Sequence, residues 1–241
     1  MIDILAFGAH PDDCEFFVAG TLLKMKQLSY KTAICDLSKG EAGTYGSAET
    51  RRQELEKASE MLSLDARITL DFPDGNIRNT EENRLQIIEV IRTLKPGLVF
   101  SFADLPMRHP DHHYCGQMVR ECCYLSGLEK IETQSPLFRP AAFIGFPELI
   151  IQKRPDFVID VTPFWQQRQE VIRCFTSQVA QPGEETAPTK TFIKSQRFWE
   201  IQEARGGMAG ALAGVKYGEP FYSTSPPRVE DPLQAFEKEI R

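Results

Sequence analysis

The sequence has no excess of basic residues and no long apolar stretch, and each absence excludes a class of partner. Its 241 residues carry 28 Lys and Arg against 34 Asp and Glu, a formal net charge of −6 at pH 7. Binding to nucleic-acid phosphates needs a cationic face, so we expect no nucleic-acid partner. No apolar run reaches the roughly 20 residues that span a bilayer, and the N-terminus lacks the features of a signal peptide. The sequence therefore predicts a cytoplasmic protein that does not bind membranes.

The sequence also lacks cysteines spaced as a disulfide or metal framework. Six cysteines are scattered along the chain without a CxxC pair. In a chain of this length the scatter favours reduced thiols, most of them small buried apolar residues. Cys14 stands apart because it follows two aspartates, and a regulatory thiol there would need exposure and a lowered pKa.

Short β-branched apolar runs alternate along the chain with segments of helical periodicity. The runs are residues 2–8, 31–37, 67–70, 97–102, 141–146 and 156–161. The periodic segments are residues 17–28, 48–64, 80–95 and 111–126, and Thr162 followed by Pro163 predicts a further helix to about residue 177. This alternation predicts an α/β, Rossmann-like fold: a mostly parallel sheet with helices on both faces and a strand order of about 3-2-1-4-5.

The length favours a single domain over residues 1–241, with the residues beyond about 147 as its C-terminal part. Glycine and proline density predicts loops at residues 39–47, at residues 181–190 and in the tail from residue 217 onward. Loops in such folds often carry functional residues.

All four histidines fall in two short segments, AHPDD at residues 9–13 and RHPDHH at residues 108–113. The segments follow the first and the fourth predicted strand, and each opens a helix. In a sheet of order 3-2-1-4-5 these strands are neighbours, and ligands bind in the crevice outside their carboxyl ends. We therefore expect the two segments to meet.

Imidazole nitrogens and carboxylate oxygens are the ligands of catalytic zinc, which keeps three protein ligands and leaves a position for water. His10 and Asp13 lie three residues apart around Pro11 and could point at one ion, with a third ligand from residues 108–113. Asp12 and a spare histidine would then be available as base and acid. The pattern predicts a shared metal site at the carboxyl ends of the first and fourth strands.

These motifs resemble those of the LmbE/PIG-L-like zinc deacetylases, which have AHPDDxE near the N-terminus and HPDH after the fourth strand. The likeness extends to LSKGEAGTYGSAETRRQE at residues 37–54, DFPDG at 71–75, FRP at 138–140 and VKYGEPF at 215–221. It is most similar to the branch that removes acetate from N-acetylglucosaminyl malate in bacillithiol biosynthesis. The resemblance implies a zinc-dependent hydrolase for such a small-molecule glycoside, and a homo-oligomer.

The resemblance also implies roles for individual residues. His10, Asp13 and His112 match the zinc ligands of the family. Asp12 matches its general base, and His109 matches the histidine that stabilises the oxyanion or protonates the leaving amine.

Further residues are expected to position these side chains or to bind the substrate. Asp111 is expected to orient a histidine, as carboxylates beside metal ligands do. Arg51 and Asp74 resemble positions that hold the sugar and its polar appendage. Arg108 and Arg139 are candidates for the malate carboxylates, because a guanidinium fork suits carboxylate geometry.

Several alternatives remain open at this point. The substrate could be another N-acetylglucosaminide. Two histidines with one carboxylate also describe non-haem iron oxygenases, so Fe²⁺ or another divalent metal and an oxidoreductase fit the ligand set, although those sites mostly occur in β-barrels. A silent sugar-binding module would not need Asp12 and His109. Dinucleotide binding lacks its signature, because FGAHPDD contains no GxGxxG.

Overall fold

The computed structural model describes residues 1–184 and 190–231. Within them, seven strands form one sheet of order β3-β2-β1-β4-β5-β7-β6. The strands are β1 (Ile4–Gly8), β2 (Thr32–Asp36), β3 (Ala66–Thr69), β4 (Leu98–Phe102), β5 (Ala142–Phe146), β6 (Phe157–Asp160) and β7 (Gly218–Ser223). Strands β1 to β5 are parallel, whereas β7 is antiparallel to both of its neighbours. The predicted order 3-2-1-4-5 is confirmed.

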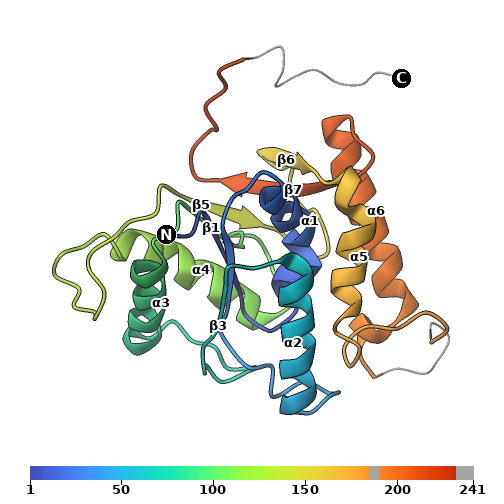
Figure 1. Cartoon of the computed structure of the whole chain (residues 1–241), viewed down its shortest axis with the longest axis horizontal. Helices are drawn as coiled ribbons and strands as arrows, with labels where there is room; N and C mark the ends of the chain where they lie inside the picture. Colours follow the sequence, from blue (N-terminus) through green and yellow to red (C-terminus); the bar gives the residue numbers. More distant parts are fainter. Residues whose placement is uncertain (185–189, 232–241) are drawn as a thin grey trace.

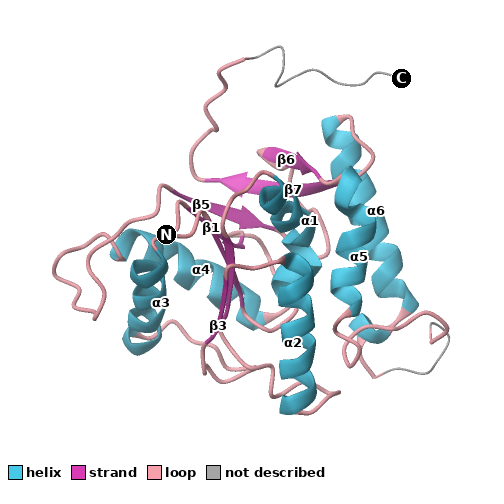
Figure 2. Cartoon of the chain, in the orientation of Figure 1, coloured by secondary structure: helices cyan, strands magenta, loops and turns pink. Residues whose placement is uncertain are grey.

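Helices cover both faces of this sheet, as predicted. They are α1 (Asp13–Gln27), α2 (Ala48–Leu62), α3 (Glu81–Leu94), α4 (Pro110–Leu125), α5 (Trp165–Arg173) and α6 (Gln196–Ala213), with 3₁₀ turns η1 (Thr162–Phe164) and η2 (Phe192–Lys194). Figure 1 shows α3 and α4 on one side of the sheet and α1, α2, α5 and α6 on the other. Figure 2 shows the same layers by element type.

The central strands explain where the candidate site lies. Every residue of β1 and of β2 is buried, which is typical of parallel strands covered on both faces. Strand β1 pairs with β4 in parallel, with Ile4 opposite Leu98. Because both strands run the same way, the residues that follow Gly8 and Phe102 emerge at the same edge of the sheet.

The prediction of a loop from residue 217 onward is wrong, because Gly218–Ser223 forms β7. Pro220 weakens the strand signal in the sequence, since proline cannot donate to a strand ladder. In the structure Pro220 lies opposite Val158 of β6, while β5 pairs only with Tyr222 and Ser223. The proline therefore sits where β7 has a single neighbour, which the local pattern does not reveal.

The helix predicted from Thr162 to about residue 177 is also shorter than expected. It starts as the turn η1, and α5 ends at Arg173. The chain then bends toward α2, where Glu54 accepts hydrogen bonds from Thr176 Oγ1 at 2.9 Å and from the Ser177 N–H at 2.6 Å. Tertiary hydrogen bonds thus replace a further helical turn.

The other loop predictions concern residues 39–47, which are irregular as expected, and residues 181–190, of which 185–189 lie outside the described residues. Helix α6 is not among the helices predicted from the sequence. In the described ranges, no helix has the length and apolar character needed to cross a bilayer. The cytoplasmic location and the homo-oligomer stay predictions.

Candidate active site

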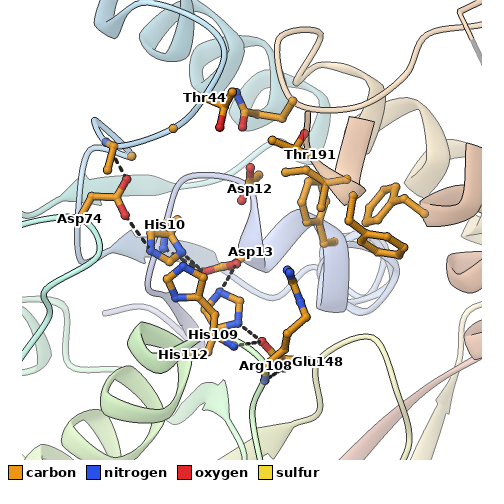
Figure 3. Close-up of a pocket in the computed structure, with 18 of the residues that line it drawn as sticks. His10, Asp12, Asp13, Thr44, Asp74, Arg108, His109, His112, Glu148 and Thr191 are labelled. Atoms are coloured by element: carbon orange, nitrogen blue, oxygen red, sulfur yellow. Dashed lines mark hydrogen bonds and ion pairs between the residues drawn. The ribbon is translucent and has the colours of Figure 1, made fainter. Parts of the chain in front are cut away.

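The two histidine segments meet at the carboxyl ends of β1 and β4 (Figure 3). The ring centroids of His10 and His109 are 4.7 Å apart, and those of His10 and His112 are 5.3 Å apart. Each of these three histidines offers a ring nitrogen within 4.8 Å of the other two. The strand order predicted from the sequence therefore brings the histidines together as expected.

Asp13 lies between two of the predicted ligands. Its Oδ1 is 3.1 Å from His112 Nε2, and its Oδ2 is 3.5 Å from His10 Nδ1. Burial alone would raise the pKa of Asp13, but His112 and His10 overcome this and hold the pKa well below its usual range. Two imidazoles around one ionised carboxylate are a donor set that fits a divalent metal of the zinc type.

His10 presents its second nitrogen to two further carboxylates. Its Nε2 is 3.1 Å from Asp74 Oδ1 and 3.2 Å from Asp111 Oδ2. Asp111 also accepts the backbone N–H groups of Gly75 at 2.7 Å and Ile77 at 3.2 Å, which fixes its position. Burial lowers the pKa of His10, yet Asp111, Asp13 and Asp74 together raise it well above its usual value. The structure thus places Asp111 against a histidine, as predicted, and that histidine is His10.

The Asp12 carboxylate pairs with Arg51, whereas that of Asp13 pairs with the histidines. The backbone φ of Asp12 is 123°, a region that residues other than glycine rarely adopt. The residue is 6% exposed, and its Oδ2 is 3.4 Å from Nη1 of Arg51. Burial raises the pKa of Asp12 to about 7, against the lowering effect of Arg51. Figure 3 shows Asp12 in the centre of the pocket, beside the histidine cluster.

Arg51 lines the pocket, whereas its neighbour Arg52 points to the surface. Arg51 is buried, and its Nη2 donates to the carbonyl oxygen of Pro11 at 2.8 Å. Gly40 covers it with a φ of 69°, and a Cβ there would lie 2.7 Å from Arg51 Nη2, so a glycine is needed. Arg52 is exposed and pairs with Glu49 on the surface of α2.

His109 is the N-cap of α4 and lines the pocket. Its Nδ1 accepts the Asp111 backbone N–H at 3.2 Å, which leaves the proton on Nε2. Burial, together with His10 and His112, lowers the pKa of His109 below its usual value. A neutral His109 with an Nε2–H donor is therefore the form that the site favours.

Glu148 is a site residue that the sequence analysis missed. It follows β5, and its carboxylate contacts Nδ1 of His112 in a pocket wall (Figure 3). Its place two residues after a predicted strand is the signal that could have found it, since the same rule located His10.

Of the two arginines predicted to bind malate, one lines the pocket and the other does not. Arg108 lines the pocket with its guanidinium 5.9 Å from the ring centroid of Phe192. Arg139 is not brought to the pocket, contrary to the prediction. Its Nη2 donates to the carbonyl oxygen of Tyr124 at 3.0 Å, near the end of α4. Twelve residues of helix separate Tyr124 from His112, which corresponds to about 18 Å.

Cys14 carries no sign of a reactive thiol. The residue is fully buried, and burial, followed by Glu15 and Asp36, raises the pKa of its thiol well above the usual value. All six cysteines are free. The structure supports the packing role for Cys14 and not the regulatory one.

The cavity above these residues has a volume of about 310 Å³. One wall is polar and comes from the loop at residues 39–47, which contributes Thr44, and from Asp74. Apolar lining comes from Leu149, Phe192 and Ile193. Pockets of this size hold one small ligand.

The fold and the donor set define an α/β enzyme with a site of two histidines and one carboxylate. The family model PIG-L, described as GlcNAc-PI de-N-acetylase, matches residues 5–123, which contain both histidine segments. The chain belongs to this PIG-L/LmbE family. It is a deacetylase of that family.

Individual relatives agree with this membership. The chain is 27% identical over 188 residues to diacetylchitobiose deacetylase of Thermococcus kodakarensis, covering 73% of this chain and 69% of that protein. It is 26% identical over 216 residues to a probable N-acetyl-alpha-D-glucosaminyl L-malate deacetylase 2 of Bacillus anthracis, covering 81% and 93%. A 4-oxalmesaconate hydratase of Pseudomonas putida is 22% identical over 192 residues, covering 72% and 73%.

Among solved structures, the conserved protein TT1542 of Thermus thermophilus superposes with a TM-score of 0.85. It is 31% identical in sequence, and the match covers 95% of this chain and 97% of that one. The likeness therefore extends through the C-terminal part, beyond the residues that the family model matches.

Proposed function

We propose that this PIG-L family deacetylase binds a divalent metal, zinc in the first place, between His10, Asp13 and His112. With it the enzyme would remove the N-acetyl group of an N-acetylglucosamine conjugate. One observation carries the proposal: each of the two histidines turns one ring nitrogen to Asp13 and the other to an outer carboxylate, Asp111 or Glu148. Outer carboxylates of this kind orient metal-binding histidines and raise their basicity.

The proton transfers would be carried out by Asp12 and His109. A zinc ion at the site would polarise the acetyl carbonyl and lower the pKa of a bound water to about 7. Asp12, held in place by Arg51, would take a proton from the attacking water and later release it toward the amine. His109 would donate its Nε2–H to the oxyanion as it develops.

For the substrate we propose N-acetylglucosaminyl malate first, the compound for which the Bacillus anthracis relative is named. Arg108 supports this choice, because it lines the pocket and pairs with no carboxylate among the described residues. Its guanidinium would receive a malate carboxylate, while Asp74 in the polar wall would receive sugar hydroxyls. Arg51 is committed to Asp12 and would support the sugar only indirectly.

The test is an assay of free-amine release from N-acetylglucosaminyl malate, methyl N-acetylglucosaminide and diacetylchitobiose, with and without a chelator. We expect release that the chelator abolishes and added Zn²⁺ restores. Arg108→Met should lower kcat/KM for the malate conjugate by about tenfold or more, the value of a charge-assisted pair. The methyl glycoside should be unaffected by this substitution.

Each alternative has its own outcome in this design. No amine from any glycoside would reject the deacetylase proposal for these substrates. Undiminished release from metal-free protein would reject the metal. Oxygen uptake by an iron-loaded sample without amine release would favour the oxidoreductase that shares this ligand set.

A further inference from the structure

Glu148 collects three donors from the start of α4. Its carboxylate contacts Nδ1 of His112 and accepts the backbone N–H groups of Arg108 at 2.6 Å and His109 at 3.4 Å. The residue is only 7% exposed, so water competes little for these contacts. A carboxylate on Nδ1 fixes the ring and its tautomer, with Nε2 directed at Asp13, 3.1 Å away.

Glu148 is in turn held by Arg205 of α6, which lies 57 positions later in the chain. Nε of Arg205 donates to the Glu148 carbonyl oxygen at 3.0 Å, and Nη2 donates to the Pro147 carbonyl oxygen at 3.2 Å. Arg205 is 4% exposed, and its guanidinium lies 5.4 Å from the ring centroid of Phe17. Both carbonyl groups belong to the turn that leaves β5, so Arg205 fixes the backbone of that turn.

The environment of Arg205 shows that burying its charged guanidinium costs free energy. In the part of the chain that the structure describes, its guanidinium forms no ion pair. Burial lowers the pKa of Arg205 to about 9, with the nearby Arg168 acting in the same direction. A buried charge is tolerated only where its hydrogen bonds are satisfied, and here the turn at residues 147–148 supplies acceptors.

We infer that Arg205 and Glu148 are positioning residues of the metal site: Arg205 holds the turn after β5, and Glu148 in that turn orients His112. The inference rests on the proposed function, since it takes His112 as a metal ligand. Helix α6 would then help to position the metal site. It contributes no proposed metal ligand, and it lies beyond the residues that the family model matches.

The test measures the zinc affinity of the full chain by competition with a chromophoric chelator, a readout independent of turnover. Glu148→Ala should weaken zinc binding by about 10- to 100-fold, the effect of losing an outer carboxylate. Arg205→Lys keeps the charge but not the two-pronged donor, so it should also weaken zinc binding. The matched control is Arg197→Met on the same helix, because Arg197 is exposed and pairs only with Glu200 in the described residues.

Melting temperatures of the zinc-free proteins are measured alongside. Variants that bind zinc as tightly as the wild type overturn the inference, including any that melt earlier, because the residues would then be merely structural. Should Glu148→Ala fail to fold, Glu148→Gln takes its place with the same expected direction. If the wild-type chain deacetylates without binding zinc, the proposed function fails instead, which is a separate result.

Discussion

Asp12 is a residue at which the chain accepts a strained backbone. Its φ of 123° lies in a region that costs about 1–3 kcal/mol for a residue with a side chain. The strain lets two successive carboxylates diverge, with Asp13 facing His10 and His112 and Asp12 facing Arg51. The separate roles proposed for these two aspartates thus follow from the turn that carries them.

We expect Asp12→Asn to retain zinc and to lose turnover by about 10²- to 10⁴-fold, because asparagine keeps the shape but accepts no proton. The measurements are kcat for amine release and the zinc content of the same preparation. Asp71→Asn is the control, since the Asp71 side chain is 82% exposed and pairs with Lys39. Full turnover by Asp12→Asn would remove Asp12 as the base.

Arg51→Met should move the acidic limb of the pH–rate profile to higher pH. Burial raises the pKa of Asp12 to about 7, and Arg51 opposes that rise, so losing the guanidinium raises the pKa further. Asp12 acts as a base only when deprotonated, and activity below the limb therefore falls. The profile of kcat/KM across neutral pH measures the shift. Arg52→Met on the exposed side of α2 should leave the limb in place, and an unmoved limb in Arg51→Met would contradict the assignment.

At the scale of elements, two helices present their first turns to the pocket. Asp13 is the first residue of α1, where the helix dipole favours a negative side chain. Helix α4 starts at Pro110, a residue suited to a first helical turn, and His109 caps it. Two of the proposed ligands, Asp13 and His112, therefore lie on helices, which hold side chains more rigidly than loops do, whereas His10 lies in the turn between β1 and α1.

Helix α4 lies directly on β4 because residue 116 has no side chain. A Cβ at Gly116 would stand 2.3 Å from the carbonyl oxygen of Phe102, a backbone atom of the sheet that cannot swing away. Gly116→Ala should lower the free energy of unfolding by about 1–3 kcal/mol. Urea denaturation measures this change.

The control for that substitution is Gly207→Ala in α6. Nothing lies within 4 Å of a Cβ there, so alanine should raise the free energy of unfolding by about 0.4–1 kcal/mol. A Gly116→Ala protein as stable as the wild type would contradict the close approach of α4 and β4.

At the scale of the whole molecule, a buried ion pair ties the C-terminal strand to the rest. Glu219 of β7 lies 3.1 Å from Nε of Arg168 in α5, and both residues are fully buried. The same carboxylate accepts the backbone N–H groups of Gly20 at 3.0 Å and Thr21 at 2.7 Å in α1. Strand β7 is thus joined to the helix that begins at the active site.

Glu219→Ala should lower the free energy of unfolding by about 3–5 kcal/mol, because it leaves the buried Arg168 uncompensated. Adding Arg168→Met should recover part of the loss, and both are measured by urea denaturation. Glu230→Ala, which breaks an exposed pair with Arg228, should change stability by less than about 1 kcal/mol. A similarly small effect of Glu219→Ala would show that the pair adds little to the fold.

The sequence by itself determined the alternating elements and the strand order through β5, and with them the meeting of the two histidine segments. These features are local or follow from parallel strands that end at one edge. Tertiary structure alone decided that Glu148 contacts His112 across 36 positions and Arg205 contacts Glu148 across 57. It also decided the place of β7. The periodicity of apolar residues indicates which face of a single helix or strand is buried. Contacts such as these depend instead on how several elements pack together.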